Sequence, residues 1–402
     1  MKRNVAIIGG GPTGLMAAYI LSKHKFDVTI YERKPTLGRK FLLAGRGGLN
    51  ITHSENIEEF LTKYGKNSKI FKPILDNFSQ KDLINFCEML GEKTFTGSSG
   101  RVFPKSFKAS PLLRSWLTKL KNQNVNMKIN HDWVGWEDNK LIFKNGIKKL
   151  IVDTDITLLA LGGSSWPKLG SDGSWIKILE KEKIKITKIQ PTNCGFFVKW
   201  STVFKNRFAG YPLKSVGLSF KNIQTKGEFI ISRDGIEGGI VYSLSSILRE
   251  NINEMGPSEV IIDLKPDFSI EKINKLLLKP RFKLTTTNYL RKTLNLSEVA
   301  IGLLMEFKNK KEINNQEIRN LAHVIKNYKL ILDKPFSIDR SISTAGGIDF
   351  KSINEDFMLT DKPNVYVAGE MLDWEAPTGG YLLQACISNG AFVANNIINK
   401  NK

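Results

Sequence analysis

The sequence has 402 residues, and 41% of them are hydrophobic, which excludes a disordered chain. Its three cysteines are widely spaced, which excludes a disulfide framework and a metal cluster. No apolar run approaches the ~18 residues that a membrane-spanning helix needs, and Pro12 interrupts the apolar start before a signal peptide could form, so we expect a cytoplasmic protein. The net charge of +21 suits anionic partners, but the basic residues are spread in short groups without an interleaved aromatic signature, which argues against nucleic acid.

Both ends of the chain predict alternating strands and helices. The first residues give a βαβ unit, with strands at 4–8 and 27–31 around a helix at 15–22. Short segments from 133 to 161, separated by polar turns, predict an antiparallel meander that leads into an apolar strand. A similar strand near the C-terminus, NVYVAGE, precedes a helix at 382–398. These elements indicate a parallel sheet assembled from distant parts of the chain.

The middle of the chain has a different pattern. Alternating and β-branched stretches between about 192 and 264 predict an antiparallel sheet or barrel. Helical spacing with charged faces follows from about 269 to 328 and predicts a small bundle. The fold class is therefore α/β. The expected domains are a Rossmann-like nucleotide-binding domain at 1–190 and 335–402, an inserted β-barrel at 191–268 and an inserted helical domain at 269–334.

The strongest local signal is a glycine motif in the first βαβ turn. Gly9, Gly11 and Gly14 form G-x-G-x-x-G directly after a strand and at the start of a helix. The first permits the tight turn, the second lets a pyrophosphate approach the backbone, and the third allows close packing of helix on strand. Glu32 ends the second strand, eighteen residues after Gly14, where its carboxylate can accept hydrogen bonds from an adenosine ribose. The alternative is a structural turn followed by an ordinary strand-end glutamate.

Two later turns favour FAD over NAD as the dinucleotide. A flavin cofactor is long, so elements far from the first turn must hold its ribityl chain and ring. Gly162 and Gly163 follow one apolar strand, and Gly379 and Gly380 precede the C-terminal helix. The N-terminus of that helix could stabilise negative charge on a reduced flavin. Either turn alone would more often be structural, but together with the first motif they indicate FAD.

Several segments resemble those of the BaiN/YhiN-like NAD(P)/FAD-dependent oxidoreductases, and the resemblance covers nearly the whole chain. They are GRKFLLAGRGGLNITHSE (38–55), GRVFPKSFKAS (100–110), LALGGSSWPKLGSDGSW (159–175), PTNCGF (191–196), FAGYPLK (208–214), GIEGGIVY (235–242), STAGGI (343–348) and AGEMLDWEAPTGGYLLQA (368–385). The resemblance implies a three-domain flavoprotein with a Rossmann-like FAD domain, an inserted barrel and an inserted helical domain. Members of that family include an aminoacetone oxidase and a bile-acid reductase.

One departure from the family pattern concerns the glycine-rich loop. Many relatives end this loop with Arg-Cys-Asn, whereas this chain has Arg46-Gly47-Gly48-Leu49-Asn50. Chemistry that depends on that cysteine is therefore absent here.

Residues at the three glycine turns are the candidates for cofactor binding. Arg46 could bind an anionic group and Asn50 could hydrogen-bond the flavin ring, although a purely structural loop explains them equally well. Glu370 resembles the acidic residue that many flavoproteins place against the ribityl chain. The full expected set is Gly9, Gly11, Pro12, Thr13, Gly14, Glu32, Arg33, Lys40, Gly45, Arg46, Gly47, Gly48, Asn50, Gly162, Gly163, Gly369, Glu370, Gly379, Gly380, Tyr381 and Leu382.

The candidates for catalysis lie beside the C-terminal turn. Glu375 and Tyr381 could donate or accept a proton, and Trp374 could form a stacking wall, with burial and capping as the alternative explanations. We expect an FAD-dependent oxidoreductase that transfers a hydride between the flavin and a small organic substrate. The chain has no second G-x-G-x-x-G after a strand, so NAD(P)H is expected only as a transient electron donor. The alternatives are a flavin-dependent RNA-modifying enzyme and a non-catalytic flavin-binding sensor.

Overall fold

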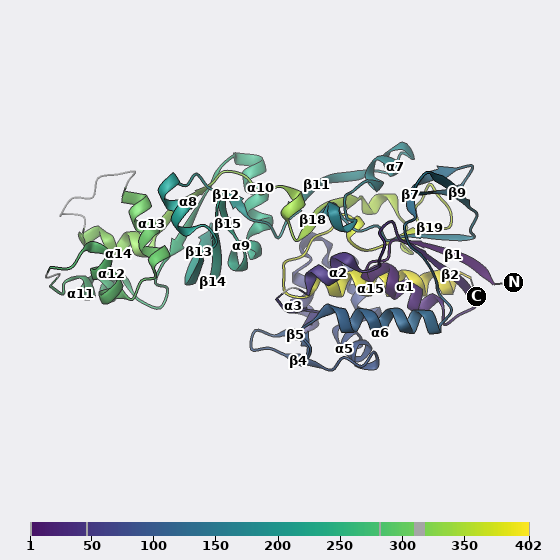
Figure 1. The fold of residues 1–402 in the computed structure, drawn as a ribbon, viewed down its shortest axis with the longest axis horizontal. Helices are drawn as coiled ribbons and strands as arrows, with labels where there is room; N and C mark the ends of the chain where they lie inside the picture. Colours follow the sequence, from purple (N-terminus) through teal and green to yellow (C-terminus); the bar gives the residue numbers. More distant parts are fainter. Residues whose placement is uncertain (1, 46, 281–282, 309–317, 402) are drawn as a thin grey trace. The chain divides into compact units, whose positions relative to one another are not determined.

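The computed structural model of the protein contains two compact units, each with its own apolar core (Figure 1). Unit 1 is formed by residues up to 190 and from 342 onward, and unit 2 by residues 191–341. The first limit equals the predicted boundary at 190, and the second lies seven residues after the predicted boundary at 335. The structure describes residues 2–45, 47–280, 283–308 and 318–401.

Unit 1 is built on a five-stranded parallel sheet in the order β19-β10-β1-β2-β6. Strands β10 and β19 are fully buried and β1 is buried from Val5 to Ile8, which their apolar sequences explain, because a parallel sheet is covered on both faces; the edge strand β6 is largely exposed. The order places β10 and β19 next to each other although they are far apart in the sequence. The strands are β1 (Arg3–Ile8), β2 (Phe26–Tyr31), β6 (Asn126–Lys128), β10 (Ile156–Leu159) and β19 (Val365–Val367).

Two helices from opposite ends of the chain pack closely in unit 1. Helix α1 (Pro12–Leu21) follows β1, and α15 (Tyr381–Lys400) runs beside it (Figure 1). A Cβ on Gly390 of α15 would lie only 2.3 Å from the carbonyl oxygen of Thr13, so the approach requires glycine. The expected βαβ unit and C-terminal helix are therefore both present. The remaining helices of unit 1 are α2 (Arg39–Ala44), α3 (Ile57–Thr62), α4 (Ser68–Asn77), α5 (Gln80–Met89), α6 (Ala109–Asn122) and α7 (Trp175–Lys181).

Three smaller sheets complete unit 1. The expected meander is present as an antiparallel sheet of β7, β8 and β9. A second antiparallel sheet, in the order β3-β5-β4, was not expected, and β11 pairs with β18 in a two-stranded sheet. The strands are β3 (Thr52–His53), β4 (Thr94–Thr96), β5 (Arg101–Pro104), β7 (Asp132–Glu137), β8 (Lys140–Asn145), β9 (Lys148–Val152), β11 (Ile186–Thr192) and β18 (Ser343–Ile348).

Unit 2 contains a six-stranded sheet in the order β12-β15-β14-β13-β16-β17, and its described neighbours pair antiparallel. Its two edges meet, because the backbone N–H of Phe197 donates to the carbonyl of Lys334 and that of Asp333 to the carbonyl of Phe197, both at 2.9 Å. The sheet is therefore closed like a barrel, as expected. The strands are β12 (Phe196–Phe197), β13 (Pro212–Phe220), β14 (Ile223–Ser232), β15 (Gly235–Glu237), β16 (Ser258–Asp263) and β17 (Tyr328–Leu332).

The segment expected to form a helical domain, 269–334, does not end in a helix, because it ends with strand β17. Strand β17 pairs with β16 from Ser258 to Ile262, and its alternating buried and exposed residues suit a sheet edge better than a helix. In the described part of the chain, no helix is both long and apolar enough to cross a bilayer. The helices of unit 2 are α8 (Thr202–Phe208), α9 (Gly239–Ser243), α10 (Ser245–Met255), α11 (Ile270–Leu277), α12 (Thr286–Leu294), α13 (Glu298–Lys308) and α14 (Ile318–Lys326).

Candidate functional site

The glycine turn after β1 has the geometry that its sequence predicts. Gly9 has a φ of +111°, and a Cβ there would lie 2.2 Å from the carbonyl oxygen of Ala160 on the neighbouring strand. A Cβ on Gly14 would lie 2.1 Å from the carbonyl oxygen of Gly9, so α1 packs directly on the turn. Gly11 differs from both, because a Cβ there would meet nothing within 4 Å. The space in front of Gly11 and the N-terminus of α1 is open to a pyrophosphate.

Glu32 at the end of β2 is bound to this turn through its carboxylate. One carboxylate oxygen accepts from the backbone N–H of Gly10 at 2.9 Å, and the other from that of Lys34 at 2.8 Å. Burial raises the pKa of Glu32, while those two hydrogen bonds act against the rise. Each carboxylate oxygen has a second lone pair, so the side chain can still accept from ribose hydroxyls.

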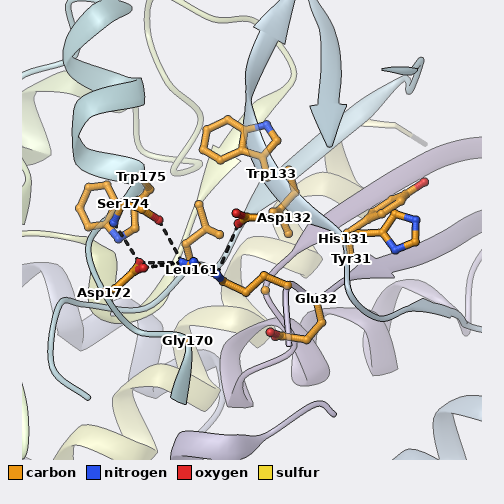
Figure 2. Close-up of a pocket in the computed structure, with 13 residues that line it drawn as sticks. Tyr31, Glu32, His131, Asp132, Trp133, Leu161, Gly170, Asp172, Ser174 and Trp175 are labelled. Atoms are coloured by element: carbon orange, nitrogen blue, oxygen red, sulfur yellow. Dashed lines mark hydrogen bonds and ion pairs between the residues drawn. The ribbon is translucent and has the colours of Figure 1, made fainter. Parts of the chain in front are cut away.

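A cavity of about 40 Å³ lies next to Glu32 (Figure 2). Arg33 is held at its side by Asp172 at 2.7 Å and Asp132 at 3.4 Å. Burial opposes ionisation of Asp172, but hydrogen bonds from Ser174 and Arg33 outweigh it and lower the pKa of the carboxyl. The indole rings of Trp133 and Trp175 also line this cavity, which therefore combines aromatic and charged groups.

A second cavity of about 110 Å³ adjoins the first, since Gly9 and Glu32 line both. It runs along the glycine turn and is closed by residues from distant parts of unit 1. The half-buried Cys386 also lines it, and desolvation raises the pKa of its thiol to about 12, so the thiol stays neutral at physiological pH. The lining residues are Gly9, Gly10, Gly11, Pro12, Thr13, Glu32, Gly38, Arg39, Lys40, Phe41, Ala160, Leu161, Gly162, Leu169, Gly170, Ser171, Glu370 and Cys386.

An ion pair between Lys40 and Glu370 borders the second cavity. The ammonium of Lys40 lies 2.9 and 2.7 Å from the two carboxylate oxygens and 2.8 Å from the hydroxyl of Ser165. The carboxylate also accepts from the backbone N–H of Thr344 at 3.2 Å. The Glu370 side chain is only 12% exposed, so the pair holds its carboxylate in a fixed position at the cavity wall.

The C-terminal glycines approach protein backbone and side chains. A Cβ on Gly380, where φ is +98°, would lie 2.6 Å from the backbone of Thr52 in β3. A Cβ on Gly369, where φ is +84°, would lie 2.5 Å from the hydroxyl of Thr13. A Cβ on Gly163 would likewise lie 2.4 Å from the hydroxyl of Thr344. These glycines therefore allow the C-terminal segment to pack against the rest of unit 1, a requirement that exists without any cofactor.

The three candidates for catalysis lie in different surroundings. Trp374 is 3% exposed, and its indole N–H donates to the carbonyl of Gly369 at 2.8 Å. Tyr381 is 6% exposed and packs against Phe60 and, as a stacked ring, against His53. Burial, together with a hydrogen bond to Glu55, raises the pKa of the Tyr381 phenol. Glu375 is half-buried, and none of the three lines the two cavities.

The loop that precedes β3 contacts strand β5. The amide of Asn50 donates to the carbonyls of Thr52 and Val102 at 2.7 and 3.1 Å, so it supports the loop itself. Leu49, at the position where many relatives have cysteine, is fully buried. Arg46 lies outside the described residues.

The structure brings together one part of the expected cofactor-binding set. Sequence reasoning missed most of the first cavity wall, including Asp132, Trp133, Asp172 and Trp175, although the segment SDGSW follows a turn that was expected to approach the cofactor. The expected residues that line the two cavities are Gly9, Gly11, Pro12, Thr13, Glu32, Arg33, Lys40, Gly162 and Glu370. The expected residues outside both linings are Gly14, Gly45, Gly47, Gly48, Asn50, Gly163, Gly369, Gly379, Gly380, Tyr381 and Leu382.

A parallel sheet with this glycine turn, strand-end glutamate and adjoining cavities defines a Rossmann-type nucleotide-binding protein. A family model described as "HI0933-like protein Rossmann domain" matches residues 3–396, and the chain belongs to that family. The family includes the BaiN/YhiN-type flavoproteins that the sequence resembles, so the resemblance is confirmed, and the protein is a flavoprotein oxidoreductase. Among the described residues no group of His, Cys, Asp and Glu side chains is arranged to hold a metal ion.

Individual relatives match the chain to different extents. A protein of Haemophilus influenzae named ribosomal RNA dihydrouridine synthase is 24% identical over 409 residues, which cover 94% of each chain. A thiamine thiazole synthase of Pyrococcus horikoshii is 34% identical, but only over 65 residues, or 16% of this chain and 26% of that one. The first match thus extends over both chains, and the second is local.

Solved structures share the fold at low sequence identity. A flavocytochrome c3 fumarate reductase has a TM-score of 0.55 at 13% identity, covering 99% of this chain and 78% of that one. A 3-ketosteroid delta1-dehydrogenase from Sterolibacterium denitrificans has a TM-score of 0.54 at 12% identity, covering 99% and 100%. The expected fold class, a Rossmann-type parallel sheet with antiparallel sheets, is therefore confirmed.

Proposed function

We propose that the protein binds FAD non-covalently along the two adjoining cavities. The adenosine lies in the first cavity, with its ribose hydroxyls donating to Glu32. The pyrophosphate lies at Gly11 and the N-terminus of α1, where the open space and the helix dipole favour it. The ribityl chain extends toward Gly162 and Glu370 in the second cavity. Bound FAD supplies hydride transfer, and the protein's residues bind and orient it.

We further propose that the substrate is a uridine base in ribosomal RNA. The observation that carries this proposal is the match over 94% of both chains to a relative named ribosomal RNA dihydrouridine synthase. The net charge of +21 supports it, because a polyanionic substrate requires a basic surface. Reduction of the C5–C6 double bond of uracil requires one hydride, which FAD would supply in its reduced form, and one proton.

A small organic substrate is the second candidate. Leu49 favours it, because this chain lacks the cysteine that many relatives carry in the same loop. If a relative protonates its substrate through that cysteine, this chain needs another acid. Cys386 is no substitute, since desolvation raises the pKa of its thiol to about 12 and makes it a weak acid.

The electron donor follows from the organisation of the chain. The described part of unit 2 is an antiparallel sheet with helices, without a second βαβ unit to bind a nicotinamide dinucleotide. NAD(P)H therefore acts as a transient donor that shares the substrate's access to the flavin. We expect ping-pong kinetics with weak saturation by NADH or NADPH.

One experiment separates the candidate substrates. The FAD-loaded protein is incubated with NADPH and unmodified ribosomal RNA, and the nucleosides are analysed by mass spectrometry. Dihydrouridine that forms only with the flavin-loaded protein supports the RNA substrate. Its absence, with a flavin that small unsaturated compounds reoxidise, contradicts the RNA substrate and supports the second candidate. A flavin that no donor reduces would contradict both.

A further inference from the structure

Three phenylalanines form a cluster on the small sheet of β3, β5 and β4. Phe95 of β4 pairs directly with Phe103 of β5, which places both side chains on one face of the sheet. Their rings stack with centroids 5.8 Å apart, and the ring of Phe107 lies 5.1 and 5.6 Å from them. We call Phe95, Phe103 and Phe107 the aromatic cluster. Phe107 is 49% exposed, so the cluster presents an aromatic ring to solvent.

The backbone holds Phe107 in an uncommon conformation. Its φ is +57°, a region that non-glycine residues rarely occupy. Its N–H donates to the carbonyl of Pro104, and its carbonyl accepts from the N–H of Leu49, both at 2.9 Å. The fold therefore maintains an exposed aromatic ring at a strained position, a combination that is concentrated at functional sites.

The segment that carries the aromatic cluster is rich in basic residues, although the carboxylate of Glu92 accepts a hydrogen bond from the hydroxyl of Ser106 beside it at 2.9 Å. From residue 93 to residue 131 the chain contains eight lysines and arginines and no aspartate or glutamate. The β4–β5 segment itself reads KTFTGSSGRVFPKSFK, in which basic residues alternate with the phenylalanines. Its four basic residues are exposed, and they are Lys93, Arg101, Lys105 and Lys108.

The aromatic cluster adjoins the glycine-rich loop expected beside the flavin. A Cβ on Gly48 would lie 3.2 Å from the ring of Phe107 and 3.6 Å from that of Phe103. Thr52 belongs to β3, an edge strand of the same small sheet, and its backbone contacts Gly380 at the start of α15. Through β3 and β5 the cluster is thus continuous with both glycine turns, which were expected at the flavin and lie outside the linings of the two cavities.

We propose that the aromatic cluster and its four basic residues bind single-stranded RNA. An unpaired base stacks on the exposed ring, and the basic side chains contact the flanking phosphates, the combination by which proteins bind single strands. The four basic residues favour an anionic partner. The exposed aromatic ring favours RNA over an acidic peptide, because an unpaired base can stack on the ring and a carboxylate cannot. This inference rests on the RNA substrate proposed above and assigns the surface that holds it.

The test measures binding of a fluorescent oligouridine to the FAD-loaded protein by anisotropy. Phe107→Leu keeps an apolar side chain without a ring, and Phe107→Trp keeps a ring. We expect the leucine variant to bind about tenfold more weakly, the scale of losing one stacked base, and the tryptophan variant to bind as the unsubstituted protein does. A double variant, Lys105→Glu with Lys108→Glu, should bind more weakly and show a smaller salt dependence.

Matched controls carry the same charge change elsewhere in unit 1. Lys144→Glu with Lys148→Glu places it on exposed residues of the β7-β8-β9 sheet and should affect binding much less. RNA binding that ignores Phe107 and responds equally to both lysine pairs would overturn the aromatic cluster as the binding surface while leaving the RNA substrate intact. A flavin-loaded protein that binds no RNA, or binds anionic vesicles through Phe107 in its place, would overturn both proposals.

Discussion

The two ends of the proposed FAD site are constructed differently. At the adenosine end, Glu32 contacts Gly10, only 22 residues away in the sequence. At the other end, Lys40 contacts Glu370, which is 330 residues away. The first end is thus a local βαβ feature, whereas the second exists only because the parallel sheet places β19 beside β10. Local spacing can define a nucleotide-binding turn, but the wall near the flavin depends on the completed fold.

The largest expected effect is at Gly11. Its φ is −82° and a Cβ there meets no protein atom within 4 Å, so Gly11→Val should leave the unloaded fold intact. If the pyrophosphate approaches this backbone, the variant should lose about 3 kcal/mol or more of FAD affinity, the scale of two hydrogen bonds to a charged group. Flavin content and the unfolding midpoint of the FAD-free protein measure the two effects separately.

Gly380 provides the contrasting case. A Cβ there would collide with the backbone of Thr52, so Gly380→Ala should lower the unfolding midpoint even without FAD. A Gly11 variant that unfolds like the Gly380 variant, or that keeps its flavin, would contradict the assignment of the open space to the pyrophosphate.

Glu32→Gln should weaken FAD binding by about 1–3 kcal/mol, because an ionised acceptor is replaced by a neutral one. The pH dependence follows from the raised pKa of the buried carboxyl. As the pH falls from neutrality toward the ordinary carboxyl pKa of 4.5, more Glu32 is protonated and FAD affinity should fall. The free energy of unfolding of the FAD-free protein should instead rise as the pH falls. The pKa of Glu32 is higher in the folded state than in the unfolded state, so protonation favours folding.

Isothermal titration of the FAD-free protein with FAD at several pH values measures how FAD affinity depends on pH. The amide that Glu32→Gln introduces does not titrate, so this variant should show the smaller pH dependence. Parallel pH profiles for the two proteins would exclude Glu32 as the titrating ligand.

Disruption of the Lys40–Glu370 pair should have a smaller effect, which we expect on the stability of the fold. Lys40→Met leaves a carboxylate that is 12% exposed without its cation, and we expect a loss of about 2 kcal/mol in the free energy of unfolding. The double variant Lys40→Met with Glu370→Gln should recover part of that loss, because it leaves no unpaired charge. Urea unfolding of the unsubstituted protein, the two single variants Lys40→Met and Glu370→Gln, and the double variant gives the coupling energy. Additive losses would show that the two side chains do not interact energetically.

The smallest expected effect on FAD affinity comes from removing unit 2. All residues that line the two cavities belong to unit 1, and β11 and β18, which flank the insertion, pair with each other. Replacing residues 194–340 by a short glycine-serine linker should therefore leave FAD affinity nearly unchanged. A folded unit 1 that no longer binds FAD would show that unit 2 supplies cofactor contacts.

The sequence predicted the elements whose signals are local. The βαβ unit, the glycine turn and Glu32 follow from spacing and apolar patterns within the first 32 residues. The sheet of β3, β5 and β4 escaped prediction because strands of two to four residues are too short to show alternation. The aromatic cluster escaped for the same reason, since only the pairing of β4 with β5 brings Phe95 to Phe103.

Long-range contacts account for the other missed features. Asp172 lies in a turn that the sequence predicted, but its partner Arg33 is 139 residues away. Gly380 was interpreted as a close approach to the flavin, whereas the backbone of Thr52 already requires a glycine there. A glycine pattern shows that something approaches closely, but it does not reveal whether a cofactor or the protein itself does.

A crystal structure of the protein with FAD would show directly whether two distant parts of the chain hold one cofactor. We expect the adenosine ribose on Glu32, the pyrophosphate at Gly11 and the ribityl chain within hydrogen-bonding distance of Glu370. An FAD that contacts Glu32 but not Glu370, or one bound outside these two cavities, would exclude this arrangement.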